Sequence, residues 1–137
     1  MYEKKQVGSY YRSRHSCFLL QYHLVLVTKY RNPVLTGRVK DTVYEMIRRT
    51  CRERDAEIIE MNGEPDHVHV LFDACPDLDI MELVNVMKSR TARIARRDNP
   101  QEVAKYYWKP YFWSDSYFIT SVGVNTAKVV KEYIEAQ

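Results

Sequence analysis

Two histidines separated by one residue, His67 and His69, are the side chains of this sequence best suited to binding a metal ion. A β-strand sends alternate side chains to the same face, so both imidazoles would point one way from the string Pro-Asp-His-Val-His-Val-Leu-Phe. Two neutral histidines leave coordination positions open for water, substrate oxygen and a further protein ligand, which suits catalysis. Histidines in strands are also common at protein surfaces and in cores where their nitrogens are hydrogen-bonded. The spacing alone therefore leaves both a metal-ligand role and a structural role open.

A second candidate group, Tyr133, lies in the last helical pattern of the sequence, with Gln137 one turn later. Their i, i+4 spacing places the phenol and the amide on the same face of a helix, as a nucleophile and a metal-directed oxygen would require. The ordinary pKa of tyrosine is about 10, so attack on a phosphate needs a nearby cation or base. Tyr133 also lies within the apolar arc of Val129, Val130 and Ile134, which makes core packing the other interpretation.

The length and composition indicate one globular domain over residues 1–137. Hydrophobic residues make up 45% of the chain and charged residues 28%, which argues against disorder. No apolar run approaches the roughly 20 residues of a membrane span, and no secretory signal is expected. The three cysteines have no metal-type spacing, so we expect a reducing, cytoplasmic location.

The net charge of +3 is distributed unevenly along the chain. Residues 1–54 carry 12 basic and 4 acidic groups, and residues 88–137 carry 9 basic and 5 acidic groups. Residues 55–87 carry 9 acidic groups and no basic one, and this block contains both histidines of the pair. Basic segments on either side of an acidic segment are suited to binding a polyanion next to a metal cation. A solvated surface on which charges cluster by chance explains the charge distribution equally well.

Hydrophobic patterning predicts an α+β fold with the element order β-α-β-β-α-β. This is the order of the ferredoxin-like antiparallel sheet with helices on one face, to which an extra β segment and a C-terminal helix carrying Tyr133 are added. Apolar residues occupy both faces of the first strand, which predicts its burial on both sides. The expected elements are strands at 17–28, 58–61 and 67–72, helices at 37–54 and 80–97, a helical turn within 101–110, and β-rich segments at 111–113 and 117–122.

Turn and cap residues set the expected boundaries of these elements. Asn62-Gly63 is the expected hairpin turn between the second and third strands. The expected helix caps are Thr36 for the first helix, Asp79 with Glu82 in a capping box for the second, and Asn125 or Thr126 for the last.

Four motifs in order carry a resemblance to a known family. They are Tyr22-His23-Leu24-Val25 through Lys29-Tyr30-Arg31, Pro65-Asp66-His67-Val68-His69, Phe112-Trp113-Ser114-x-Ser116-Tyr117, and Lys131-Glu132-Tyr133-Ile134-Glu135-Ala136-Gln137. In order and spacing these motifs resemble the single-tyrosine HUH transposases of the insertion-sequence-two-hundred-like family, which move small bacterial and archaeal elements as single-stranded DNA. The resemblance spans nearly the whole chain.

The resemblance implies a specific chemistry. His67 and His69 would bind Mg²⁺ or Mn²⁺, Gln137 would complete the metal site, and Tyr133 would attack the scissile phosphate. The products would be a 5′-phosphotyrosine link and a free 3′-OH, and the reverse reaction would rejoin DNA. The implied partners are single-stranded element ends folded into hairpins and a second copy of the chain, with composite active sites in the homodimer; no nucleotide cofactor is implied.

Basic residues near these motifs are the expected DNA contacts, although each taken singly is also explained as a solvated charge. The expected contacts are Arg14, Lys29, Arg31, Lys88, Arg90, Arg93 and Arg97. Exposed bases would stack on aromatic residues such as Tyr10, Tyr11 or Tyr30. The aromatic stretch 111–118 is expected to pair across two subunits. His15 and His23 match no metal motif and are expected to be structural or surface residues.

Two alternatives accompany the transposase hypothesis. The first is a domesticated relative that applies the same chemistry to chromosomal palindromic repeats. The second is a non-catalytic regulator that binds DNA hairpins, in which Tyr133 packs in the core and the two histidines are structural.

Overall fold

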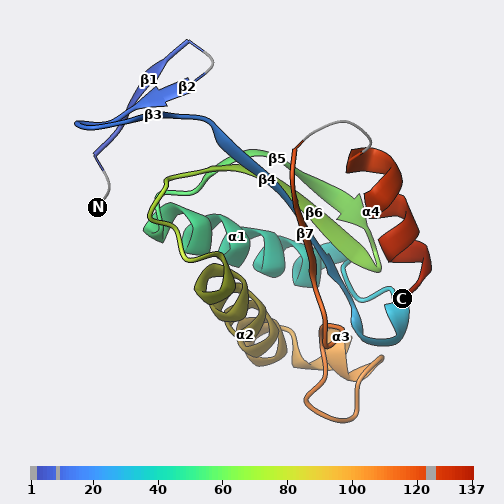
Figure 1. Ribbon diagram of the computed structural model, residues 1–137. Coiled ribbons are helices and arrows are strands. Elements are labelled where there is room, and N and C mark those ends of the chain that lie inside the picture. The colour runs from blue at the N-terminus through green and yellow to red at the C-terminus, as the bar shows by residue number, and fades with distance from the viewer. Residues whose placement is uncertain (1–2, 9, 123–125) are drawn as a thin grey trace.

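A four-stranded antiparallel sheet with the order β5-β6-β4-β7 forms the centre of the computed structural model, which describes residues 3–8, 10–122 and 126–137 (Figure 1). Strand β6 lies between β4 and β5, so the two strands that helix α1 connects run parallel to each other. This is the split βαβ arrangement predicted from the element order. In chain order, the strands of this sheet and the helices that cover it are β4 (Leu20–Val27), α1 (Gly37–Glu53), β5 (Glu57–Glu64), β6 (His67–Ala74), α2 (Ile80–Asp98), β7 (Phe118–Ser121) and α4 (Thr126–Glu135).

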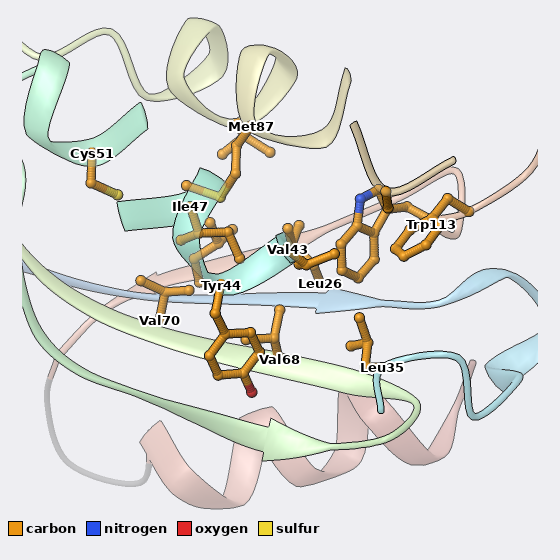
Figure 2. Packing of buried hydrophobic residues seen from close by; sticks show 14 of the residues in the cluster. Leu26, Leu35, Val43, Tyr44, Ile47, Cys51, Val68, Val70, Met87 and Trp113 are labelled. Atoms are coloured by element: carbon orange, nitrogen blue, oxygen red, sulfur yellow. The ribbon is translucent and has the colours of Figure 1, made fainter. Parts of the chain in front are cut away.

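Helices lie on both faces of this sheet, with α1 and α2 on one side and α4 on the other (Figures 1 and 2). The main core lies between the sheet and the α1–α2 pair, where Val68 and Val70 of β6 are fully buried (Figure 2). A smaller apolar cluster forms between α4 and the opposite face, where Val25 and Val27 contact Ile134. The added C-terminal helix therefore covers the face to which His67 and His69 alternate. In the described ranges no helix is long and apolar enough to cross a bilayer.

Strand β4 is central in the sheet, as its continuous apolarity predicts, and residues 24–27 are fully buried. The predicted strand 17–28 is nevertheless two strands, because the chain changes sheets at Leu19. Cys17 and Phe18 form β3 (Cys17–Phe18), which pairs with β2 (Tyr10–Arg12) beside β1 (Lys5–Val7) in a small second sheet. Tyr11 of this small sheet is buried and donates a hydrogen bond to Asp73 on β6, at 2.6 Å. The expectation that Tyr11 stacks on bases is therefore wrong.

The helix caps agree with the sequence in position. Asp79 accepts a hydrogen bond from the Glu82 backbone N–H, as the capping box predicts. Thr36 precedes α1 as expected, but its side chain makes no capping hydrogen bond. Helix α4 begins at Thr126, and the alternative cap Asn125 lies outside the described residues.

The β5–β6 hairpin turns at Pro65-Asp66, so the predicted turn at Asn62-Gly63 is wrong. Both of those residues continue strand β5, where Gly63 pairs with Val68. A Cβ on Gly63 would overlap the His67 carbonyl oxygen and approach the Val68 Cα to 2.9 Å. Glycine is therefore required here by the close approach of two backbones rather than by a turn.

Residues 111–113 do not form the predicted β segment. Trp113 makes an isolated bridge to Thr28, and both Phe112 and Trp113 are buried in the main core. The Trp113 indole N–H donates to the Thr91 hydroxyl at 2.8 Å, which holds this stretch against α2. These two side chains therefore pack in the core, whereas Phe118 begins β7 at the edge of the sheet, and pairing of this stretch across two subunits stays a prediction. The preceding helical turn is present as α3 (Pro100–Ala104).

Candidate metal and nucleophile site

His67 begins strand β6 directly after the hairpin turn, and its position is fixed from both sides. The Asp66 carbonyl accepts hydrogen bonds from the Thr28 backbone N–H and hydroxyl, which fastens the turn to the end of β4. The Asp66 carboxylate oxygen Oδ1 lies 2.7 Å from His67 Nδ1, and Oδ2 accepts from Arg31 at 3.1 Å. Burial works to raise the pKa of Asp66, but the hydrogen bonds with His67 and Arg31 outweigh it and lower that pKa below its ordinary value. A carboxylate at Nδ1 leaves His67 Nε2 as the nitrogen with a free lone pair.

His69 has a comparable partner in His23, which lies on the neighbouring strand β4. His23 Nε2 and His69 Nδ1 are 3.1 Å apart. Burial, followed by the nearby imidazoles of His67 and His23, lowers the pKa of His69 to about 4. Burial also lowers the pKa of His23. His69 is therefore neutral at physiological pH, which is the form that binds a metal ion.

These partners fit a metal site at the two histidines. If each imidazole coordinates through Nε2, each Nδ1 carries a proton that has an acceptor, Asp66 for His67 and His23 for His69. The two rings are close, with centroids 4.8 Å apart and nearly perpendicular planes. Across the described ranges, no cluster of three or more His, Cys, Asp and Glu side chains is arranged to hold a metal ion, so further ligands would be amide, water or substrate oxygens.

Tyr133 lies in the last turn of α4 and Gln137 two residues beyond its end, and two serines of the loop before β7 hold both side chains. The Tyr133 hydroxyl lies 2.7 Å from the Ser116 hydroxyl, and the Tyr133 ring packs on Phe118 with centroids 5.1 Å apart. The Gln137 amide oxygen accepts from Ser114 at 3.3 Å and from Ser116 at 3.5 Å. The phenol and the amide thus share Ser116 as a partner and lie on the same side, as their i, i+4 spacing predicts.

Lys88 anchors the loop that carries these serines. Its ammonium group reaches from α2 and donates to the carbonyl oxygens of Ser114 at 2.8 Å and Ser116 at 3.5 Å. Burial lowers the pKa of Lys88, and the nearby Asp115 carboxylate partly offsets that effect. Lys88 is therefore placed to position the loop and, through Ser116, the Tyr133 hydroxyl.

The histidines and Tyr133 border the same face of the sheet. Val25 of β4 pairs with His69 of β6 on one side and with Phe118 of β7 on the other. Tyr133 of α4 packs on Phe118 of β7, and the imidazoles belong to β6. These two strands flank β4 and lie roughly 10 Å apart at the usual strand spacing. The two histidines and Tyr133 therefore lie on the same side of the sheet within one chain.

The other predicted DNA contacts fall into two groups. Lys29 and Arg31 lie beside the site, where they form ion pairs with Asp115 and Asp66 respectively. The structure does not bring the remaining four to the site. Arg90 forms an ion pair with Glu53 of α1, and Arg97 forms one with its neighbour Asp98. Arg93 is exposed on α2, and Arg14 is exposed between β2 and β3.

His23, Ser114 and Ser116 are the site residues whose roles the residue pattern alone does not reveal. His23 faces the histidine pair because β4 and β6 pair in a register that places His23 opposite Leu71, two residues from His69. That register cannot be read from spacing along the chain. The two serines do lie within a family motif, which marks the segment without assigning their partners.

Comparison with known proteins identifies the class. Residues 16–137 match the family model described as "Transposase IS200 like", which covers most of the chain. The chain belongs to the IS200-like transposase family.

Two relatives and two solved structures give the degree of similarity. The ISDra2 transposase TnpA of Deinococcus radiodurans is 36% identical over 92% of this chain and 89% of its own length. The transposase for insertion sequence element IS200 of Salmonella typhimurium is 27% identical over 90% of this chain and 80% of its own.

The crystal structure of a Deinococcus radiodurans R1 protein assigned as a transposase superposes with a TM-score of 0.83 at 30% identity, covering 92% of this chain and 96% of its own. A REP-associated tyrosine transposase bound to a REP hairpin superposes with a TM-score of 0.59 at 13% identity, over 90% of this chain and 69% of its own, which shows a shared fold.

Proposed function

We propose that this protein is a transposase that cleaves and rejoins single-stranded DNA at the hairpin-bearing ends of an insertion sequence. Membership of the IS200-like family supports DNA transposition. The observation that carries the chemistry is the arrangement of the two imidazoles with free Nε2 atoms and of the Tyr133 hydroxyl on one face of one sheet. The Ser116 hydroxyl, 2.7 Å from the phenol oxygen, is placed to orient that oxygen.

In this proposal Tyr133 is the nucleophile. Its phenolic oxygen forms a bond to the scissile phosphorus while the bond from phosphorus to the 3′ oxygen breaks. The phenol proton passes to solvent, and the departing 3′ oxygen takes up a proton to become a free 3′-OH. The product is a 5′-phosphotyrosine, and attack by a 3′-OH on that linkage reverses the step and frees Tyr133.

His67, His69 and Gln137 would hold Mg²⁺ or Mn²⁺. When bound, the ion supplies charge stabilisation at a non-bridging phosphate oxygen and lowers the barrier to attack. Asp66 and His23 would orient the two imidazoles, and Ser116 would hold the phenol toward the phosphate. Phosphate and water oxygens would fill the remaining positions, which favours these ions over softer ones.

The DNA and the dimer complete the proposal. The solved REP-associated transposase is bound to a hairpin, and we propose that this chain also binds DNA hairpins, as a homodimer. Lys29, Arg31 and Lys88 are the predicted DNA contacts that bind residues at the site, namely Asp115, Asp66 and the backbone of Ser114 and Ser116. Composite sites between two subunits remain a prediction.

Incubation with single-stranded DNA that carries the hairpins flanking its gene tests the proposal. A denaturing gel should show a covalent protein–DNA band that requires Mg²⁺ or Mn²⁺ and is absent in Tyr133→Phe. Hairpin binding without a covalent band under either metal would instead support the non-catalytic regulator. Hairpins that flank the gene as element ends would support a transposon. Hairpin repeats scattered over the chromosome would instead support a domesticated relative.

A further inference from the structure

An exposed group of aromatic and basic side chains lies beside the proposed active site. Trp108 is 85% exposed and Tyr30 is 70% exposed, although both have large aromatic side chains. The Lys109 ammonium lies 4.7 Å from the centroid of the Trp108 ring. The Lys29 ammonium lies 5.4 Å from the Tyr30 centroid and 5.2 Å from that of Tyr111. We call these five residues the aromatic platform.

The platform is built from two segments that the fold binds tightly together. The Tyr107 hydroxyl donates to the Lys29 carbonyl at 2.7 Å, and the Lys29 backbone N–H donates to the Phe112 carbonyl at 2.8 Å. The Asn32 amide donates to the Tyr106 carbonyl at 3.4 Å. Residues 29–32 and 106–112 therefore form one surface, although about 80 residues separate them in sequence.

Tyr30 is held in a conformation that most side chains avoid. Its φ is 60° and that of Arg31 is 55°, both in the left-handed region, where a bulky non-glycine residue is strained. The surrounding hydrogen bonds keep this short turn, η1 (Lys29–Arg31), in place, and the result is that the Tyr30 ring is directed to solvent. Strain that exposes an aromatic ring beside a site indicates a use for that ring.

The charge of the platform fits a polyanion. Residues 28–32 and 105–112 contain Lys29, Arg31, Lys105 and Lys109 and no carboxylate. Lys29 and Arg31 form ion pairs on the side facing the site, through Asp115 and Asp66. Among the residues that the structure describes, no carboxylate forms an ion pair with Lys105 or Lys109. Exposed aromatic rings interleaved with cations are the arrangement that binds single-stranded nucleic acid, because bases stack on rings while cations contact phosphates.

We propose that the aromatic platform binds unpaired bases of single-stranded DNA next to the scissile phosphate, with Trp108 and Tyr30 as stacking surfaces. This inference rests on the proposed function and specifies how that site would hold its substrate. The link to the chemistry is direct, since Arg31 shares the Asp66 carboxylate with His67 and Lys29 pairs with Asp115 between the two serines. A strand that stacks on the platform would therefore continue directly into the site.

The test measures binding of a fluorescein-labelled oligothymidylate by anisotropy, with full-length protein and EDTA so that no cleavage occurs. Trp108→Ala and Tyr30→Asn should each raise the Kd about 5-fold or more, the loss expected for removal of one stacking ring. Asparagine is chosen because it tolerates the φ of 60° at this position. Trp108→Phe should retain most of the affinity. Ile59→Ala, exposed on β5, and Met81→Ala, exposed on α2, should change the Kd less than about 2-fold.

Two further readouts separate stacking from other roles. Oligothymidylate should quench the tryptophan emission of the wild-type protein and not that of Trp108→Phe, because Trp113 is buried. Light scattering reports whether Trp108→Ala changes the oligomeric state. Unchanged affinity in both platform variants, an equal loss for a fully paired hairpin stem, or loss of a dimer in Trp108→Ala would overturn the proposal. None of these measurements depends on Tyr133, so a failure of stacking is distinguishable from a failure of covalent cleavage.

Discussion

Replacing His23 with phenylalanine should weaken Mn²⁺ binding while leaving the fold intact. When His69 coordinates through Nε2, its Nδ1 must carry the proton, and His23 Nε2 at 3.1 Å is the acceptor for that proton. Without metal, the neutral His69 ring can move its proton to Nε2, so the loss of His23 costs little in the metal-free protein. The penalty therefore appears in metal affinity rather than in the free energy of unfolding.

The magnitude follows from two estimates that agree. A donor left without its acceptor in a partly buried position costs about 1–3 kcal/mol. Removal of a hydrogen-bond partner behind a metal-binding histidine typically lowers metal affinity about 10- to 100-fold, which corresponds to about 1.4–2.7 kcal/mol. We expect His23→Phe to fall in this range.

Electron paramagnetic resonance of free Mn²⁺, titrated at neutral pH, measures this affinity directly. His23→Gln restores an acceptor and should recover most of the binding. His15→Phe, a change at the exposed histidine between β2 and β3, is the matched control and should bind as the wild type does. Wild-type affinity in His23→Phe would refute the role assigned to His23, and equal losses in His23→Gln and His23→Phe would show that packing is responsible.

Three further changes test other parts of the structure. Ser116→Ala removes the hydrogen-bond partner of the Tyr133 hydroxyl. One net hydrogen bond contributes about 0.5–1.5 kcal/mol, so cleavage should slow about 2- to 13-fold. Hairpin binding, measured by gel shift, should be unchanged. Tyr11→Phe leaves the buried Asp73 carboxylate short of a donor and should lower the free energy of unfolding in urea by about 1–3 kcal/mol, whereas Tyr10→Phe should have little effect. Gly63→Ala forces a Cβ against the His67 backbone and should cost about 1–3 kcal/mol or more in the same assay, so wild-type stability would contradict the close approach.

The order of elements was predictable because each main element has a strong periodic pattern. Strand β4 is apolar on both faces, α1 and α2 carry clear apolar stripes, and Asp79 caps α2 as its sequence indicates. The incorrect predictions are at positions where contacts between residues distant in sequence determine the local structure. Asn62-Gly63 has turn-forming residues, but the glycine serves a close backbone approach within β5. Residues 111–113 have strand-forming side chains, but burial of Phe112 and Trp113 against the core holds them irregular.

The site was predictable only in part for the same reason. His67 with His69, and Tyr133 with Gln137, are local pairs whose shared faces follow from strand and helix periodicity. The contact of His23 with His69 depends on strand register, and the contacts of Ser114 and Ser116 depend on how the loop before β7 folds against α4. Charge patterning likewise did not reveal that Arg90 pairs with Glu53 of α1, and its DNA contact stays a prediction.

The central claim is that Tyr133 becomes covalently joined to the 5′ phosphate at the cleavage site. The most direct test uses an element-end oligonucleotide labelled on either side of that site, followed by mass spectrometry of the protein–DNA adduct. The account predicts that the adduct carries only the downstream label, that the released upstream fragment ends in a 3′-OH which a polymerase extends, and that the modified peptide contains the nucleotide on Tyr133. An adduct on another residue, a 3′ linkage, or cleavage without any adduct would contradict it.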